Sequence, residues 1–326
     1  MRIKKTLKII IATIIVVVVV VNAIIAIQAY SLSHFKNDAS EIKPDHSPSV
    51  GEMIKITFTG LDVPRPQVKQ YPPQPYDSIY IPCGDDKKLH GWVLRTDSLK
   101  RGLAITFHGY MEEKSAMLNK ALLLKDMGYD ILMVDFMGAG RSYGDQTTLG
   151  YLEAENVKAA YDYAISEMKE DNVLFLGFSM GAVAVMKAQH DYDMPVKGVI
   201  LEAPYGNFSG TVNARLDLFG LPHFPLSDIF TYWFGKLNGF DAFHANPEDF
   251  SKKVFSPTLL MCGSKDQYIS EGEIHTIFEN LGSRNKEVKF FSESTHESYL
   301  VKHSEEWKMT VSEFLRKIDK MDVFYD

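Results

Sequence analysis

Residues 173–181 join an apolar run to the sequence Gly-Phe-Ser-Met-Gly at 177–181. A Gly-x-Ser-x-Gly pattern between a buried strand and a helix is typical of a nucleophile elbow. The chain must reverse sharply there, and a side chain at Gly177 or Gly181 would collide with neighbouring backbone. The turn lifts the Ser179 hydroxyl clear of the sheet, at the positive end of the next helix. The pattern predicts that Ser179 is a nucleophile; an ordinary Gly/Ser turn is the alternative, because so short a motif recurs by chance.

A serine hydroxyl is a weak nucleophile until a base removes its proton, and a carboxylate must stabilise the imidazolium that forms. The chain supplies both groups after Ser179. Asp266 follows the predicted strand Thr258–Met261, and His296 follows the predicted strand Glu287–Phe291. Functional groups of open α/β sheets gather at the carboxyl ends of the strands. The order Ser, Asp, His therefore predicts a catalytic triad of Ser179, Asp266 and His296.

A site for acyl transfer also needs two backbone N–H groups that hold the negative oxygen of the intermediate. The first is expected from Met180, directly after the nucleophile. The second is expected from Tyr110, in the loop after the predicted strand Leu103–Phe107, where Gly109 permits close approach of the backbone. His108 precedes the nucleophile in the chain, so we interpret it as a brace for this loop rather than as the base.

Strands and helices alternate from about residue 76 onward. This alternation predicts an α/β fold with a mostly parallel sheet and helices on both faces. A β-hairpin is expected first, at Ser78–Pro82 and Leu89–Arg95. Further strands are expected at Leu103–Phe107, Asp130–Val134, Asn172–Leu176, Gly198–Leu201, Thr258–Met261 and Glu287–Phe291, and helices at Lys114–Met127, Tyr151–Glu170, Ala182–Gln189, Glu271–Leu281 and Glu305–Ile318.

Two segments lack this alternation. Residues 205–250 are rich in aromatic residues and punctuated by Gly and Pro, and we interpret them as an irregular cap insertion that forms a lid or acyl pocket. Residues 31–75 contain seven prolines and are predicted to be an irregular stalk, in which Met53–Phe58 has the weak alternation of a strand. The expected units are an N-terminal anchor or signal of residues 1–30, this stalk, and a domain of residues 76–326.

Four basic residues precede an apolar stretch of 19 residues, Ile9–Ile27, whose only polar members are Thr13 and Asn22. As a helix this stretch would span roughly 28 Å, close to the hydrocarbon thickness of a bilayer. A cleaved signal peptide has a shorter apolar core and a cleavage site of the form small-x-small. Residues 27–29 match such a cleavage site poorly. We expect an uncleaved single-pass anchor in the lipid bilayer, with a cytoplasmic N-terminus and the remaining chain outside; secretion after cleavage is the alternative.

Charge restricts the partners of the remaining chain. Residues 37–326 carry 30 Lys and Arg against 42 Asp and Glu, a net charge of −12. A domain so acidic is expected to repel nucleic acid and anionic lipid surfaces. The two cysteines, Cys83 and Cys262, form no disulfide framework, and the histidines outside the triad lack the spacing of metal ligands. The chemistry predicted for Ser179 needs no metal and no organic cofactor, so none is expected.

The joint order of these motifs resembles that of the α/β-hydrolase superfamily, especially its bacterial membrane-anchored or secreted serine hydrolases of the BEM46-like and serine-aminopeptidase-like type. The resemblance covers residues 77–320 and rests on His108-Gly109, the Asp-x-x-Gly-x-Gly-x-Ser turn at 135–142, the elbow at 177–181, Asp266 and His296. It implies the α/β-hydrolase fold, with a mostly parallel eight-stranded sheet and a small cap. It also implies an esterase, lipase, thioesterase, amidase or peptidase without choosing among them.

Two assignments follow from this resemblance. Asp135 and Arg141, in the glycine-rich turn, are interpreted as structural residues. Glu202, after the predicted strand Gly198–Leu201, stands where some relatives carry a different triad acid. We prefer Asp266, because its Gly-x-x-Asp sequence matches the motif better than the surroundings of Glu202.

The residues together predict a serine hydrolase that acts outside the cytoplasm on a small-molecule acyl substrate. It would cleave an ester, thioester or amide through an acyl-enzyme. The aromatic residues of 205–250 weakly favour an acyl or lipid-like ester over a peptide. A peptidase or an acyltransferase with the same triad, and a non-catalytic binding or signalling protein on the same fold, are the alternatives.

Overall fold

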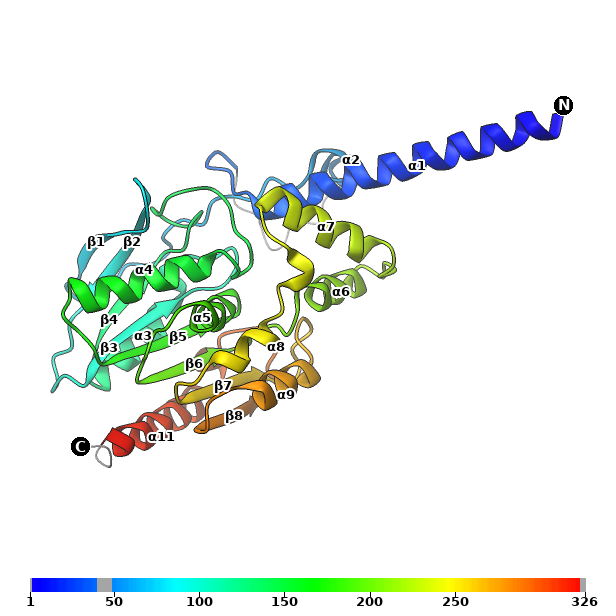
Figure 1. Ribbon diagram of the computed structural model, residues 1–326. Helices are drawn as coiled ribbons and strands as arrows, with labels where there is room; N and C mark the ends of the chain where they lie inside the picture. The colour runs from blue at the N-terminus through cyan, green and yellow to red at the C-terminus, as the bar shows by residue number, and fades with distance from the viewer. Residues whose placement is uncertain (1, 40–48, 323–326) are drawn as a thin grey trace.

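An eight-stranded sheet forms the centre of the computed structural model, which describes residues 2–39 and 49–322 (Figure 1). Its strands are β1 (Asp77–Pro82), β2 (Lys88–Leu94), β3 (Gly102–Phe107), β4 (Tyr129–Val134), β5 (Val173–Phe178), β6 (Gly198–Glu202), β7 (Thr258–Gly263) and β8 (Lys286–Phe291). Their order across the sheet is β1-β2-β4-β3-β5-β6-β7-β8. β2 is antiparallel to β1 and β4, and the other neighbouring pairs are parallel. The predicted α/β-hydrolase fold with a mostly parallel sheet is confirmed.

Continuous apolar runs explain the inner strands. Every residue of β3, β4, β5 and β7 is buried, as expected for parallel strands that helices cover on both faces. In the view of Figure 1, α4 and α5 lie in front of the sheet. The helices of this domain outside the cap are η1 (Lys114–Met117), α3 (Leu118–Asp126), α4 (Glu153–Ser166), α5 (Met180–Asp191), η3 (Ser251–Lys253), α9 (Glu271–Asn280), α10 (Tyr299–Lys302) and α11 (Ser304–Asp322).

The N-terminal helix α1 (Arg2–Ser33) projects away from the domain (Figure 1). Residues 4–20 are exposed, whereas Ala29 is fully buried where α1 packs against α7 (Leu226–Asn238). By length and composition, α1 is able to cross a membrane. It extends beyond the predicted stretch Ile9–Ile27, because residues 28–33 continue the helix along the surface of the domain.

The strand predicted at Met53–Phe58 is wrong. This segment lies in helix α2 (Val50–Thr59), and none of its residues is buried. Ser49 and Glu52 form a capping box that starts the helix: Oγ of Ser49 accepts the N–H of Glu52, and the Glu52 carboxylate accepts the N–H of Ser49 at 2.7 Å. The weak alternation of apolar residues does not outweigh this local signal, since the segment has no neighbouring strand to pair with.

The cap segment is more regular than the sequence suggested. It contains α6 (Phe208–Leu218), α7, η2 (Ala242–His244) and α8 (Pro247–Phe250). The Gly and Pro residues between 220 and 225 separate two helices instead of breaking the whole segment. Phe208 of α6 and Phe234 of α7 are buried with ring centroids 4.9 Å apart, in a small core that also holds Ala29 of α1. The aromatic residues therefore fix the cap against the N-terminal helix.

Asp135 organises the glycine-rich turn after β4. Its carboxylate accepts the backbone N–H of Lys114 at 2.9 Å and the Lys114 ammonium at 2.7 Å, and its backbone oxygen accepts the Ser142 hydroxyl at 2.6 Å. Burial would raise the pKa of Asp135, but the hydrogen bond with His90 and the charge of Lys114 hold this pKa well below its usual value. At Gly140, where φ is +48°, a Cβ atom would collide with the same carboxylate. These contacts agree with a structural role for Asp135.

We predict that Asp135→Asn lowers the free energy of unfolding by about 3–5 kcal/mol, because it leaves the fully buried Lys114 ammonium without a counter-charge. The depressed pKa implies that this stabilisation is present at neutral pH and is lost only as the pH falls through the folded-state pKa. Urea unfolding of the full-length protein in a neutral detergent measures the change. Asp162→Asn is the control, because its pair with Lys158 lies on the surface and contributes less than about 0.5 kcal/mol. Equal losses in the two variants would contradict the role given to Asp135.

Candidate active site

Ser179 lies between β5 and α5 in a conformation that side-chain-bearing residues rarely adopt, with φ 51° and ψ −114°. The flanking glycines make this turn possible. A Cβ at Gly177 would lie 2.6 Å from the nitrogen of Ala182, and one at Gly181 would lie 2.3 Å from the carbonyl oxygen of Phe107. The backbone N–H of Ser179 donates to the Glu202 carbonyl at 2.7 Å, which ties the turn to β6.

The structure brings Ser179, Asp266 and His296 together from three separate loops. Nε2 of His296 is 2.9 Å from Oγ of Ser179, and Nδ1 of His296 is 2.7 Å from the Asp266 carboxylate. Oδ1 of Asp266 also accepts the backbone N–H groups of Tyr268 at 2.8 Å and Ile269 at 3.1 Å. The Asp266 side chain is fully buried, and the His296 side chain is 16% exposed. The aspartate is therefore held in place by groups other than the histidine that it orients.

These contacts define how the imidazole of His296 is able to act. Asp266 has no proton to give when ionised, so its bond with Nδ1 requires that Nδ1 carries the hydrogen. Nε2 is then left as an acceptor that faces the Ser179 hydroxyl. This is the tautomer in which a histidine removes a proton from a serine, with a carboxylate that stabilises the resulting imidazolium.

The two predicted oxyanion donors lie at the same pocket. Tyr110, in the loop after β3, and Met180, the first residue of α5, line it together with Ser179 and His296. The Tyr110 hydroxyl donates to the backbone oxygen of Leu32 at 2.7 Å. The end of the N-terminal helix α1 therefore contacts the loop that carries the predicted oxyanion donor.

His108 has no free nitrogen with which to act as a base. It is buried, and its Nε2 accepts the backbone N–H of Phe136 at 3.0 Å. Its Nδ1 is 2.8 Å from the Gly109 carbonyl oxygen, to which it donates in this tautomer. The Gly109 N–H in turn donates to the Glu112 carboxylate at 2.9 Å. His108 connects the loop after β3 to the loop after β4, as expected for a brace.

Glu202 is fully buried and has partners of its own. Its carboxylate pairs with the ammonium of Lys120 and accepts the indole N–H of Trp307 at 2.8 Å. Asp266, and not Glu202, lies against the His296 ring. The geometry favours Asp266 as the acid that orients the histidine.

Several residues of the pocket were not singled out from the sequence. Leu149, Tyr205, Thr211, Arg215, Tyr268 and Ile269 complete its lining. Thr211 and Arg215 lie four residues apart in α6, so recognising that helix from residues 208–218 would have placed both on one face. The cavity beside Ser179 is about 20 Å³, which is room for about one water molecule.

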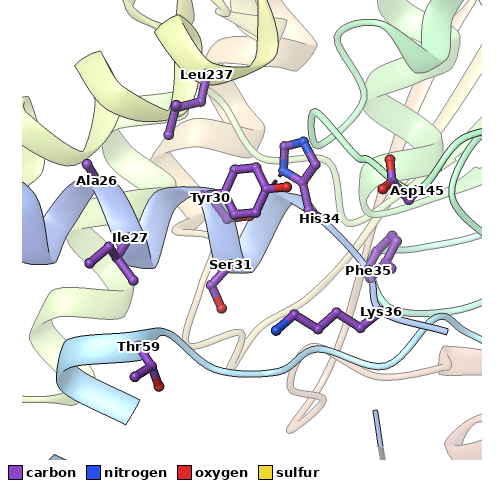
Figure 2. Close-up of a pocket in the computed structure, with 10 residues that line it drawn as sticks. All are labelled: Ala26, Ile27, Tyr30, Ser31, His34, Phe35, Lys36, Thr59, Asp145 and Leu237. Carbon is purple, nitrogen blue, oxygen red and sulfur yellow. Dashed lines mark hydrogen bonds between the residues drawn. The ribbon is translucent and has the colours of Figure 1, made fainter. Parts of the chain in front are cut away.

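A larger cavity of about 460 Å³ lies where α1 meets the domain. Figure 2 shows its lining, with Tyr30 of α1, His34 directly after that helix, and Leu237 of α7. The rings of Tyr30 and His34 stack with centroids 4.0 Å apart. Ser179, Asp266 and His296 do not line this cavity. We therefore interpret it as a gap in the packing of the N-terminal helix against the domain.

The chain is similar to several known proteins. The family described as serine aminopeptidase, S33, matches residues 99–220. The uncharacterized protein YqkD of Bacillus subtilis is 24% identical over 215 residues, which are 65% of this chain and 70% of that protein. The esterase Pf2001 of Pyrococcus furiosus is 23% identical with a TM-score of 0.62, over 78% of this chain and 98% of that one. The proline iminopeptidase of Mycobacterium smegmatis is 15% identical with a TM-score of 0.57, over 76% and 100% of the two chains.

With the eight-stranded sheet and the order of its motifs, these matches show that the chain has the α/β-hydrolase fold, and residues 99–220 are similar to the serine aminopeptidase family. Its fold is that of esterases and peptidases, and the family match supports a hydrolase. Among residues 2–39 and 49–322, no group of three or more His, Cys, Asp and Glu side chains is placed to hold a metal ion.

The two candidate acids are distinguished by parallel measurements of activity and stability. We predict that Asp266→Asn lowers ester turnover by about 10⁴-fold, because it favours the wrong tautomer of His296, while the melting temperature changes little. Glu202→Gln should lower the melting temperature strongly, because it leaves the buried Lys120 ammonium unpaired. Turnover per folded molecule and thermal unfolding by circular dichroism provide the two readouts. Near-normal turnover in Asp266→Asn, together with inactive but folded Glu202→Gln, would reverse the assignment.

Proposed function

We propose that the protein is a serine hydrolase that cleaves a carboxylic ester, thioester or amide through an acyl-enzyme. The observation that carries the proposal is the continuous chain of contacts from the Ser179 hydroxyl through His296 to Asp266. In an accidental cluster, the serine would not also sit in a strained turn that two flanking glycines make possible. The similarity to an esterase and to a peptidase agrees with this class of reaction.

The first half of the proposed reaction forms the acyl-enzyme. Nε2 of His296 takes the proton as Oγ of Ser179 bonds to the substrate carbonyl carbon. The carbonyl oxygen becomes negative and is held by the N–H groups of Tyr110 and Met180. The imidazolium then donates its proton to the leaving alcohol, thiol or amine while the bond to that group breaks.

In the second half of the proposed reaction, water hydrolyses the acyl-enzyme by the same kind of proton transfers. His296 takes a proton from a water molecule, which attacks the acyl carbon, and returns that proton to Ser179 as the acid leaves. Asp266 stays ionised and stabilises each imidazolium. The cavity beside Ser179 is smaller than most ligand pockets, which measure about 300–1,000 Å³, so we propose that the cap moves to admit an acyl substrate.

We predict that Ser179→Ala reduces hydrolysis of p-nitrophenyl butyrate by about 10⁴-fold or more, with little change in melting temperature. The reason is that the variant keeps the turn and the pocket but lacks the oxygen that forms the acyl-enzyme. Ser312→Ala, an exposed serine of α11, is the matched control and should keep full activity. Equal rates in the wild type and Ser179→Ala would instead fit a non-catalytic binding protein.

We also propose that α1 anchors the protein in a membrane with the hydrolase domain outside the cytoplasm. Apolar side chains are exposed along α1 and on α2, which contacts it, where Met53, Ile54 and Phe58 are exposed. Phe219 and Phe224 are also exposed, in the loop before α7, the cap helix that packs against α1. Figure 1 shows α2 and the cap next to the point where α1 leaves the domain. Basic residues before the apolar stretch favour a cytoplasmic N-terminus.

We expect the full-length protein to remain in the membrane after alkaline carbonate extraction. In intact cells that have no outer membrane, protease added to the medium should cleave the hydrolase domain. The residues before the apolar stretch should stay protected in the cytoplasm. The intact mass of the purified protein should be that of a chain that still contains residues 1–30. A mature chain that begins near residue 30 and is soluble after carbonate treatment would establish signal cleavage instead.

A further inference from the structure

Arg215 extends from the cap helix α6 into the pocket that contains Ser179 and His296. Its guanidinium carbon lies 5.0 Å from the ring centre of Tyr268. The Tyr268 ring in turn meets the His296 ring edge-on, with centroids 5.5 Å apart. One aromatic ring therefore separates a permanent positive charge from the imidazole of the proposed triad.

Local contacts hold Arg215 without neutralising it. Its NH1 donates to the backbone oxygen of Thr211 at 2.8 Å and to the Thr211 hydroxyl at 2.7 Å. In the part of the chain that the structure describes, no Asp or Glu oxygen lies within 4.0 Å of the guanidinium. Nε and NH2 form no hydrogen bond with described residues. These remaining donors match the geometry of a carboxylate or phosphate.

Several other polar groups at or beside the pocket already have hydrogen-bond partners. Asp266 accepts hydrogen bonds from His296, Tyr268 and Ile269. The hydroxyls of Tyr110 and Tyr205 donate to backbone oxygens of residues 32 and 149. The pocket thus presents a cation that has no direct ion pair with a described residue, although residues 37–326 carry a net charge of −12. Such a cation near the reacting atoms attracts anions and repels ammonium groups.

We propose that Arg215 selects acyl substrates that carry a carboxylate or phosphate close to the scissile bond. This inference rests on the proposed hydrolase function. The anionic group belongs either to the acid half of the ester, as in a monoester of a dicarboxylic acid, or to the alcohol half, as in an acylglycerol phosphate. The same charge disfavours substrates with a cationic group at that position, including the protonated N-terminus that an aminopeptidase binds.

Three pairs of esters, matched in shape, test the proposal with the full-length protein in neutral detergent. Methyl hexanoate and monomethyl adipate compare a neutral and a negative acid half. Monobutyrylglycerol and its 3-phosphate compare the alcohol half. The third pair is 3,3-dimethylbutyl butyrate and butyrylcholine, in which a cation replaces a neutral group. Chromatography of the released acid gives kcat/KM for the wild type, Arg215→Lys, which keeps the charge, and Arg215→Gln, which removes it.

We expect the wild type to prefer at least one anionic ester over its neutral partner and to disfavour butyrylcholine. Arg215→Gln should lower kcat/KM for the preferred anionic ester by about 10- to 100-fold, and lower kcat/KM for its neutral partner much less. Arg215→Lys should keep part of the preference for the anionic ester, because the charge remains. It should bind that ester less well than the wild type, because an ammonium cannot form the two parallel hydrogen bonds of a guanidinium. Raising the ionic strength should reduce the preference of the wild type.

Two results would overturn the inference. One is a wild type that cleaves neutral and anionic esters at equal kcat/KM. The other is an equal loss on all esters in Arg215→Gln, which would make the residue a structural partner of Tyr268 and Thr211. Failure of the proposed function is recognised separately, because then no ester is cleaved faster by the wild type than by Ser179→Ala.

Discussion

The turn between β5 and α5 places Ser179 at φ 51° and ψ −114°, a conformation that costs a residue with a side chain about 1–3 kcal/mol. The strain is sustained because the strand and the helix on either side are buried throughout or nearly so, and because the Ser179 N–H is bonded to β6. Gly177 and Gly181 admit the backbone contacts that the turn requires. The position of the hydroxyl opposite His296 depends on this constraint.

Buried ion pairs support the loops around that turn. Lys120 pairs with Glu202, whose backbone oxygen accepts the Ser179 N–H. Lys114 pairs with Asp135 next to the loop of the predicted oxyanion donor Tyr110. Neither pair touches the Ser179 hydroxyl, so both are interpreted as supports. The contact between the Tyr110 hydroxyl and the carbonyl of Leu32 extends this support to the N-terminal helix. The N-terminal helix, the loop after β3 and the turn at Ser179 are thus connected through one set of contacts.

The fold, and the proximity of Ser179, Asp266 and His296, could be predicted from the sequence. The reason is that sharp turns and strand ends have local signatures in the chain. The sequence was insufficient where structure depends on distant packing. The helix at 50–59 depends on a cap that outweighs weak alternation, and the cap helices depend on Phe208 and Phe234 meeting across the segment. Arg215 was missed for the same reason, since only the folded cap brings it to the pocket.

Covalent labelling with an alkyl fluorophosphonate tests the central assignment most directly, because this probe reacts with a serine whose proton a neighbouring base removes. Mass spectrometry of peptides from the labelled full-length protein identifies the modified residue. We predict one adduct, on Ser179, with fluoride released and with labelling lost in His296→Ala. A folded protein that shows no adduct, or one labelled at a different serine, would contradict the assignment of Ser179 as the nucleophile.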